Sequence, residues 1–443
     1  MKKVRILIMI FLDGVAWYAA FLAMLFVRYP FSDIRENLLI HIGLFSALFL
    51  LWLLLFYIAG LYQSHVHKSA SHLFRVFLPT ISVGVFVSII IFYISAPLFL
   101  LTPKTNLILF VFFFGLIDFC IRVVEIKFFI TYGARTKIIL AGDTPELAIV
   151  AAYIEENPYL GYELVYCSPS ADEHKICAML GSDCFRESDV VVVALPLIRK
   201  DGMVQRVIYE TILPSQKEFF DSVTFYEMLF QKVPIEVIQE YWFVEKVASK
   251  NKVYGSYERM FDCSLAILLL GLFSPIFCMV AILIKCTSRG RIIYKQVRVG
   301  KGGTYFTLYK FRTMKMDAEK NGPQWAQKDD PRTTMIGKLL RFTHVDELPQ
   351  LFNILKGDLS FVGPRPERPE FVKELRKHIP YYDVRHIVKP GLTGWSQINY
   401  RYGSSIEDAR EKLKYDIYYL KEKSFIFNLL IIIKTIKFFI FNM

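Results

Sequence analysis

Paired cysteines are missing from this chain. Seven cysteines are present, but no two have the C-x-x-C spacing that zinc sites and redox motifs use. We interpret them as free thiols in a reducing compartment or within a bilayer. The basic, apolar start of the chain also has no small-residue cleavage site after it, so it is predicted to be a retained membrane anchor rather than a signal peptide.

Charged residues are scarce as well. They make up 21% of the chain, against 54% hydrophobic and 16% aromatic residues, which is too apolar for an ordinary soluble protein. The formal net charge is +12. With so many apolar runs, we interpret this excess as attraction to anionic lipids and phosphate ligands, and expect no nucleic-acid partner. At 443 residues, the chain has room for two or three domains.

Four apolar runs in the first third approach the roughly 20 residues that cross a bilayer. They are residues 6–27, 38–62, 76–101 and 107–123. Lysine and arginine cluster before the first run, between the second and third, and after the fourth. The positive-inside rule therefore places both ends of this segment in the cytoplasm. Residues 1–132 are predicted to form a four-helix transmembrane bundle.

Three charged residues stand inside these runs. Asp118 and Arg122 are four residues apart, so they share one helical face and are predicted to pair. Asp13 is open to two interpretations, a transport path or a contact between helices. We favour the contact, since a single acid near a helix end is more often structural.

The glycines of a dinucleotide-binding fingerprint are missing from the middle of the chain. Strands are predicted at 137–142, 162–167 and 189–195, with a helix at 145–156, which indicates a parallel, Rossmann-like sheet within residues 133–250. Of the G-x-G-x-x-G pattern only Gly142 is present, and Asp143 and Glu146 would repel a pyrophosphate. We therefore favour a structural, regulatory or dimerising role over nucleotide binding.

A fifth apolar run, residues 263–284, has no charged residue and is long enough to span. A plain span would send the basic residues that follow it across the membrane, against the positive-inside rule. Ser274-Pro275 lies in its middle, where proline should bend the helix and serine can bond the freed carbonyls. We therefore favour a re-entrant helix at about 260–286 over a span, with its break at Ser274-Pro275.

Two adjacent carboxylates, Asp346-Glu347, precede an apolar face. Residues of that face recur at spacings of three and four, namely Leu348, Leu351, Phe352 and Leu355. Thr343 and Asp346 have the spacing of a capping box, which predicts a helix start that would hold Asp346 ionised. Such a carboxylate is a candidate nucleophile or metal ligand. The local spacing by itself favours a simple helix cap.

Basic residues on glycine- and proline-rich loops surround this pair in the sequence. Arginines on rigid loops suit bidentate recognition of phosphate. The candidate phosphate-binding arginines are Arg312, Arg341, Arg365 and Arg401. Two carboxylates among several cations indicate phosphoryl transfer with a divalent ion. Each motif alone is typical of a structural turn, but their combination is hard to explain that way.

The region from about residue 257 to the C-terminus resembles the bacterial sugar transferases, also called monotopic polyprenyl-phosphate phosphoglycosyl transferases. The resemblance rests on Arg259-Met260-Phe261-Asp262, Ser274-Pro275, Lys310-Phe311-Arg312-Thr313-Met314, Asp346-Glu347-Leu348-Pro349-Gln350, Gly363-Pro364-Arg365-Pro366 and Lys389-Pro390-Gly391-Leu392-Thr393-Gly394-Trp395. The four preceding runs and the α/β segment look like the long form of that family. Residues 251–443 would then be a mainly α catalytic domain.

The resemblance implies transfer of a sugar 1-phosphate from a UDP-sugar to undecaprenyl phosphate. Asp346 would form a covalent phosphosugar intermediate with release of UMP, and Glu347 would serve as metal ligand or in proton handling. Asp346 and Glu347 would hold Mg²⁺, and the four arginines would hold the nucleotide and lipid phosphates. His344 departs from the family pattern, and we favour a neutral contact for it over a metal or acid–base role.

Further expectations follow from the same resemblance. They are a bacterial inner-membrane location with the catalytic domain on the cytoplasmic face, a homodimer, and the first membrane step of exopolysaccharide, capsule or O-antigen synthesis. The apolar run 424–443 carries Lys434 and Lys437, which suits a helix at the membrane interface. The donor sugar stays open between glucose and galactose.

Two other classes of protein remain as alternatives. A multi-pass transporter or receptor with a cytoplasmic regulatory domain would need more polar residues in its spans than the three present. A nucleotide-dependent redox or ligand-sensing protein would need an intact glycine loop in the middle segment.

Overall fold

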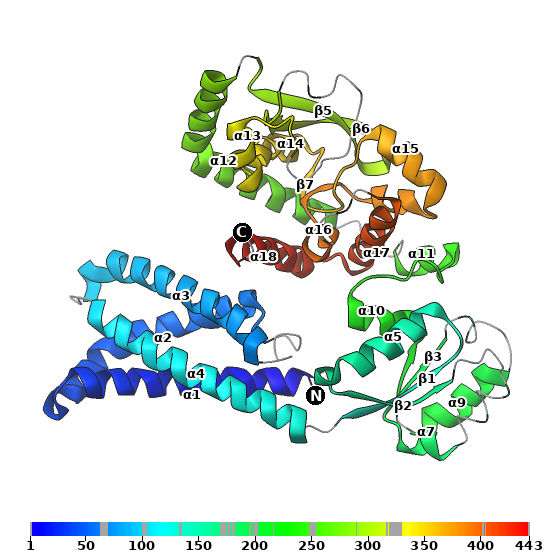
Figure 1. The fold of residues 1–443 in the computed structure, drawn as a ribbon, viewed down its shortest axis with the longest axis horizontal. Helices are drawn as coiled ribbons and strands as arrows, with labels where there is room; N and C mark the ends of the chain where they lie inside the picture. Colours follow the sequence, from blue (N-terminus) through cyan, green and yellow to red (C-terminus); the bar gives the residue numbers. More distant parts are fainter. Residues whose placement is uncertain are drawn as a thin grey trace. The chain divides into compact units, whose positions relative to one another are not determined.

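The computed structural model forms two compact units, Met1–Ser222 and Val223–Phe441 (Figure 1). It describes residues 2–62, 70–99, 104–132, 135–168, 174, 178, 182–194, 196, 198, 203–215, 217–247, 254–288, 290–315, 318, 330–400, 403 and 405–441. The sequence-predicted domain boundaries near 132 and 250 divide the chain more finely and stay predictions.

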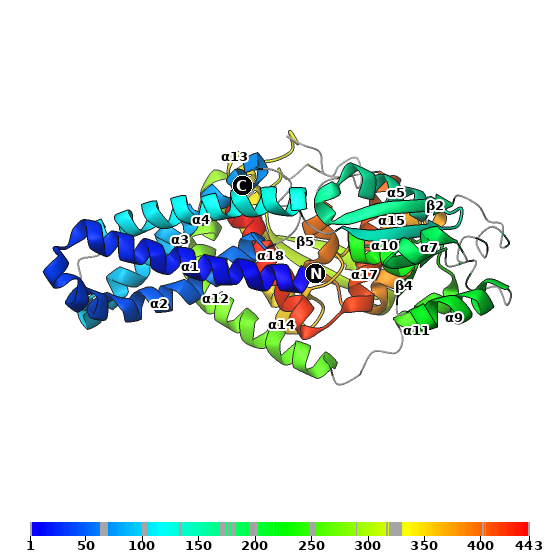
Figure 2. The same cartoon turned by 90° about the horizontal axis from the view of Figure 1, so that it is seen from below.

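The four apolar runs of the first third lie largely in long helices, and the last two residues of the third run, 100 and 101, are outside the described residues. These helices are α1 (Lys2–Arg28), α2 (Ile34–Ala59), α3 (Ala70–Phe99) and α4 (Lys104–Tyr132). Together with α12 (Tyr254–Thr287), they are the five helices in the described part of the chain that are long and apolar enough to cross a membrane. A multi-pass membrane protein is therefore supported. Figure 2 shows α1 running beside α4, the pair with the most extensive contact among the four.

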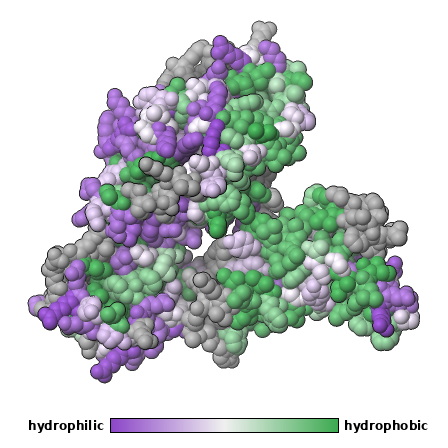
Figure 3. All heavy atoms as spheres, turned by 180° about the vertical axis from the view of Figure 1, so that it is seen from behind, coloured by the Kyte–Doolittle hydropathy of each residue, from purple (hydrophilic) through white to green (hydrophobic). Residues whose placement is uncertain are grey.

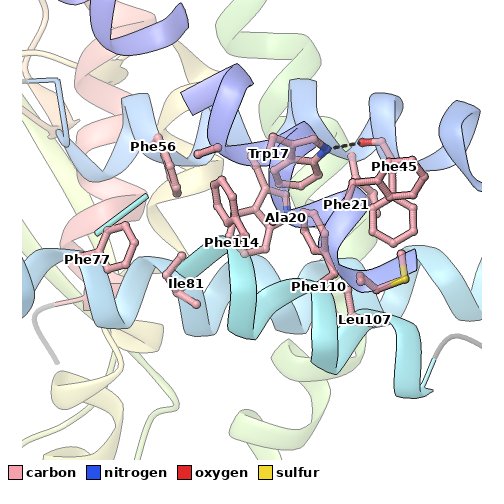
Figure 4. Packing of buried hydrophobic residues seen from close by; sticks show 14 of the residues in the cluster. Trp17, Ala20, Phe21, Phe45, Phe56, Phe77, Ile81, Leu107, Phe110 and Phe114 are labelled. Carbon is pink, nitrogen blue, oxygen red and sulfur yellow. Dashed lines mark hydrogen bonds between the residues drawn. The ribbon is translucent and has the colours of Figure 1, made fainter. Parts of the chain in front are cut away.

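Aromatic side chains hold these four helices around one core (Figure 4). The Trp17 Nε1 donates to the Phe45 carbonyl oxygen at 3.1 Å, which satisfies its polar atom inside the core. Its ring meets those of Phe110 and Phe114 edge-on, with centroids 4.5 and 5.0 Å away. Edge-to-face contacts of this kind add specificity to the packing of apolar helices.

The three charged residues of the runs form one buried cluster. Arg122 lies 2.8 Å from Asp118 on α4 and 2.7 Å from Asp13 on α1. The Tyr62 hydroxyl also donates to Asp13, at 2.5 Å. The predicted pairing of Asp118 with Arg122 is confirmed, and Asp13 is the interhelical contact that we favoured.

A small parallel sheet follows, with strand order β2-β1-β3-β4. Its strands are β1 (Thr136–Ala141), β2 (Tyr162–Ser168), β3 (Val190–Val193) and β4 (Glu218–Asp221), and its helices include α5 (Pro145–Glu156), α7 (Asp183–Glu187) and α9 (Met203–Ser215). Three strands and α5 lie where the sequence predicted them. The fourth strand was missed because it is only four residues long and has an acid at each end.

The second unit combines short strands with packed helices. β5 (Ile293–Val299) and β6 (Tyr305–Phe311) form an antiparallel hairpin, and β7 (Ser360–Val362) pairs in parallel with β8 (Gly391–Thr393). The helices besides α12 are α10 (Ser222–Phe230), α11 (Glu240–Lys246), α13 (Met335–Phe342), α14 (Gln350–Lys356), α15 (Pro369–His378), α16 (Trp395–Asn399), α17 (Ile406–Glu422) and α18 (Phe425–Phe441). Leu351, Phe361 and Trp395 are buried at the centre of the main core.

Helix α12 runs without interruption through Ser274 and Pro275. Pro275 has no N–H for the Gly271 carbonyl, and the Ser274 hydroxyl donates to that oxygen instead, at 2.8 Å. This substitute bond, which the sequence predicted, helps the helical pattern to continue past Pro275, and Figure 1 shows α12 changing direction along its length. A turn back toward the same membrane face stays a prediction.

Both halves of α12 pack on the same unit. Ala266 belongs to the main core, whereas Val280 and Ile284 lie in a second cluster with Phe311. The opposite side is exposed and apolar, with Ile267, Leu268, Leu272, Met279 and Ile282 all more than half exposed. Figure 3 shows the hydrophobic surface over α12 and over α1–α4. The helix is therefore amphipathic in its packing, with one side toward protein and the other free to face lipid.

Candidate active site

The acid pair lies in a single turn between two helices. Asp346 and Glu347 belong to the 3-10 turn η5 (Val345–Glu347), between α13 and α14. Thr343 closes α13, with its hydroxyl donating to the Leu339 carbonyl at 2.9 Å. The predicted capping box of Thr343 with Asp346 is therefore wrong. Between Thr343 and Asp346 the backbone adopts a left-handed conformation at His344, whose φ is 55°. The helix α14 begins only at Gln350.

Glu347 is the ionised member of the pair. Its Oε1 accepts from Lys310 Nζ at 2.7 Å and from Arg365 Nη2 at 2.8 Å. Burial acts to raise the pKa of Glu347, but Arg365 and Lys310 outweigh it and hold this pKa well below its usual range. Glu347 is therefore a fixed negative charge that aligns two cations.

Asp346 has a different environment, although it is the neighbouring residue. Its side chain is 7% exposed and makes no hydrogen bond to another residue in the described part of the chain. Burial raises its pKa to about 6; Lys310, Arg341 and Arg365 oppose this rise, and Glu347 adds to it. The expectation that a helix dipole holds Asp346 ionised is wrong, because burial raises its pKa and the α-helix α14 begins only at Gln350. At neutral pH, Asp346 is an ionised carboxylate without a hydrogen-bond partner among the described residues.

Arg341 and Arg365 reach the acid pair from different elements. Arg341 lies on α13, and its Nε donates to the Thr313 hydroxyl at 2.9 Å. A Cβ on Gly337 would lie 2.0 Å from the Thr313 carbonyl oxygen, so only glycine lets α13 pack this closely. Arg365 extends from the loop 363–367. The charges of both arginines act on Asp346.

The other two predicted arginines are Arg312 and Arg401. The Arg312 guanidinium donates to the Ser288 carbonyl at 3.0 Å and to its hydroxyl at 2.5 Å, which ties the end of β6 to the end of α12. Arg401 lies outside the described residues. The structure thus groups Asp346 and Glu347 with Arg341 and Arg365, and their expected roles in binding substrate stay predictions.

Lys310 is a site residue that the sequence analysis did not single out. It lies near the end of β6 and contacts Glu347, and burial lowers its pKa while Glu347 acts to raise it. Its motif was recognised, but a lysine on a strand is usually solvated. The contact with Glu347, which the sequence does not reveal, is what marks Lys310 as part of the site.

His344 and the question of a metal can be judged from the same geometry. Burial lowers the pKa of His344, while Glu347 acts to raise it, and the neutral contact that we favoured for this residue stays a prediction. No group of three or more His, Cys, Asp or Glu side chains in the described ranges is arranged to hold a metal ion. Mg²⁺ commonly uses one or two carboxylates together with substrate phosphates. The adjacent carboxylates fit an ion shared with a diphosphate, and do not fit a cage built by protein alone.

These features define a protein with helices long and apolar enough to cross a membrane and with an acid pair surrounded by cations. A family model described as bacterial sugar transferase matches residues 253–442. A putative undecaprenyl-phosphate N-acetylgalactosaminyl 1-phosphate transferase of Bacillus subtilis is 49% identical over 139 residues, which cover 31% of this chain and 78% of the relative. The chain belongs to the bacterial sugar transferase family.

Two longer relatives extend this finding. The UDP-N-acetylgalactosamine-undecaprenyl-phosphate N-acetylgalactosaminephosphotransferase of Aeromonas hydrophila is 44% identical over 187 residues, or 42% of this chain and 44% of the relative. The UDP-glucose:undecaprenyl-phosphate glucose-1-phosphate transferase of Xanthomonas campestris is 28% identical over 327 residues, which cover 68% of this chain and 65% of the relative. The match thus spans less than half of the Aeromonas relative. Of these two matches, the one to the Xanthomonas relative is long enough to extend beyond the second unit of this chain.

Proposed function

We propose that this protein transfers a sugar 1-phosphate from a UDP-sugar to undecaprenyl phosphate. The observation that carries the proposal is the buried Asp346 carboxylate, ionised at neutral pH and surrounded by the charges of Lys310, Arg341 and Arg365. A nucleophile aimed at an anionic phosphate needs such neighbouring cations. The names of the relatives, which act on undecaprenyl phosphate, support the same class of reaction.

The proposed reaction has two displacements at one phosphorus atom. A carboxylate oxygen of Asp346 attacks the β-phosphorus of the UDP-sugar, the bond to the bridging oxygen breaks, and UMP leaves. The sugar phosphate is then bound to Asp346 as an acyl phosphate. A phosphate oxygen of undecaprenyl phosphate attacks the same phosphorus, which restores the carboxylate and forms undecaprenyl diphosphate sugar. Splitting the transfer in this way separates a soluble and a lipid substrate in time.

The remaining residues of the site act on charge and position. Arg341 and Arg365 would bind the diphosphate oxygens, and Glu347 would keep Lys310 and Arg365 in place through the bonds at 2.7 and 2.8 Å. Asp346 and Glu347 would hold Mg²⁺ together with those oxygens, and the ion would neutralise developing charge on the phosphates.

Helix α12 supports a membrane-facing catalytic unit. Both of its halves pack on one compact unit, and its other side is apolar and exposed. A straight span would separate its two ends by a bilayer. We therefore infer partial insertion from the cytoplasmic face of the bacterial inner membrane, where the lipid headgroup reaches Asp346. In this proposal the parallel sheet is a degenerate Rossmann-like domain that regulates or dimerises the enzyme.

The transporter alternative is weakened by the bundle itself. Asp13, Asp118 and Arg122 contact one another rather than lining an open path. The polar groups that a transport path would use are therefore occupied by structural bonds within the four helices.

Purified protein in detergent or nanodiscs, given undecaprenyl phosphate and Mg²⁺, is expected to release UMP from at least one UDP-sugar. A panel should include UDP-glucose, UDP-galactose, and the N-acetyl forms of both. UMP is measured by a coupled luminescence assay, and the lipid product by mass spectrometry. No UMP from any donor would contradict the proposed function.

The rate of UMP release is expected to fall about tenfold per pH unit below about pH 6, because protonation removes the nucleophile. The sign follows from the raised pKa: the reactive carboxylate is present above about pH 6 and lost below it. The profile should be measured as kcat/KM between pH 4.5 and 8, with the protein's fold monitored by circular dichroism. A flat profile down to pH 5 would contradict this assignment of Asp346.

A further inference from the structure

The loop that carries Arg365 is held by hydrogen bonds at each successive carbonyl. Four donors from separate parts of the second unit reach it. The carbonyl oxygens of Pro364, Arg365, Pro366 and Glu367 accept from Gly391 N at 3.0 Å, Arg385 Nη2 at 3.0 Å, Arg298 Nη1 at 2.9 Å and Val299 N at 2.9 Å. Two prolines also restrict the backbone of this loop. The peptide from which the Arg365 side chain starts is thus fixed in place.

Arg385 is the donor that holds the carbonyl of Arg365 itself. It belongs to the 3-10 segment η6 (Tyr382–Ile387) and is 7% exposed. Its Nη1 donates to the Tyr382 hydroxyl at 2.6 Å, and its Nη2 lies 2.9 Å from Asp416 on α17. Asp416 in turn accepts from the Ser396 hydroxyl at 2.7 Å. The guanidinium is therefore held by Tyr382 and Asp416 as well as by the carbonyl of Arg365.

We propose that Arg385, held by Asp416, is a positioning residue that fixes Arg365 against Glu347. Arg385 contacts the Arg365 backbone, and the Arg365 side chain donates to Glu347 at 2.8 Å, so the order of the acid pair depends on Asp416 through two arginines. The inference rests on the proposed function, because its readout is the reaction at Asp346.

A purely structural role of the Arg385–Asp416 pair can be distinguished from a positioning role by replacing both residues together. A buried ion pair can often be replaced by apolar residues with little loss of stability, because both desolvation penalties disappear together. Removing only one partner leaves an unpaired buried charge, which destabilises the protein. A double replacement therefore separates stability from the directional bond that Arg385 donates to Arg365.

The test compares Arg385→Met with the double variant Arg385→Met/Asp416→Leu. The single variant should unfold at a lower temperature, and the double variant should recover most of that loss. UMP release by the double variant should nevertheless stay about 10- to 100-fold below wild type, the size of effect expected when a reacting group is misplaced by about 1 Å. Its acid limb should also move to higher pH, because a displaced Arg365 no longer lowers the pKa of Asp346.

A double variant with wild-type rate and an unchanged acid limb would overturn the proposal. If the double variant does not fold, Arg385→Lys decides the matter. It keeps a charge beside Asp416, but lysine cannot reach Asp416, Tyr382 and the Arg365 carbonyl together. It should fold and lose activity with the same pH shift, and wild-type kinetics would overturn the proposal.

Two controls make the outcomes distinguishable. Arg376→Leu breaks an exposed pair with Asp383 at 2.7 Å in the same unit, and both its stability and its pH profile should match wild type. Wild-type protein that releases no UMP would contradict the proposed function. Wild-type protein that releases UMP, beside a double variant with unchanged kinetics, would contradict only the positioning role.

Discussion

The variant Asp346→Asn is expected to lose UMP release by on the order of 10³-fold or more, since the amide cannot form the acyl phosphate. Wild-type protein incubated with a UDP-sugar and no lipid acceptor should gain the mass of one sugar phosphate. The asparagine variant should gain nothing in the same intact-mass measurement. A mass increase on the variant would place the covalent step on another residue.

The stability of Asp346→Asn separates catalysis from a structural role. The pKa of Asp346 is raised from its usual value to about 6, so its ionised form at pH 7 destabilises the folded protein. Asparagine removes that charge, and the thermal unfolding midpoint at pH 7 should equal or exceed that of wild type. A helix cap would instead lose about 1 kcal/mol on losing its carboxylate. Asp358→Asn, a half-buried carboxylate just beyond α14, serves as the matched control and should retain its activity.

The variant Glu347→Gln is expected to reduce the rate about 10²-fold, the size found when a preorganised charged group is removed from a site. Lys310 and Arg365 would lose the carboxylate that aligns them. The remaining activity should persist to lower pH than in wild type, because the Glu347 charge raises the pKa of Asp346 and its loss lets the cations lower it. The measurement is the acid limb of kcat/KM.

The same substitution should also destabilise the fold by about 1–2 kcal/mol, since it leaves two cations facing each other, one of them partly exposed. Glu374→Gln is the matched control, because Glu374 pairs with Lys377 on the surface of α15. Its rate and profile should stay at wild-type values. A Glu347→Gln protein with wild-type rate and acid limb would show that Glu347 does not order the site.

Much of the fold follows from local sequence signals. The helices α1–α4 come from long apolar runs with three charged residues among them, and β1, α5 and β3 come from apolar segments separated by Gly142 and Pro145 or, for β3, rich in valine. The pairing of Asp118 with Arg122 follows from their spacing of four residues on one helix. The acid pair and its arginines were also found in the sequence, because such side chains cluster there in recognisable motifs.

Other features depended on contacts between distant residues. Thr343 closes one helix instead of opening the next, because His344 adopts a left-handed conformation that the capping-box spacing does not reveal. Glu218–Asp221 is a strand only because β3 pairs with it. Lys310 lies on β6 and Arg312 directly after it. Lys310 donates a hydrogen bond to Glu347, whereas Arg312 donates to Ser288.

The sequence by itself determined that this is a membrane-associated member of the bacterial sugar transferases with an acid pair among cations. Only the tertiary structure decided which acid does what. Glu347 accepts hydrogen bonds from Lys310 and Arg365 and stays ionised. Asp346 is buried beside the same charges without a side-chain hydrogen bond to any described residue, and its pKa rises to about 6. Two neighbouring carboxylates differ because burial and charge are set by side chains from β6, α13 and the loop 363–367, which no local spacing encodes.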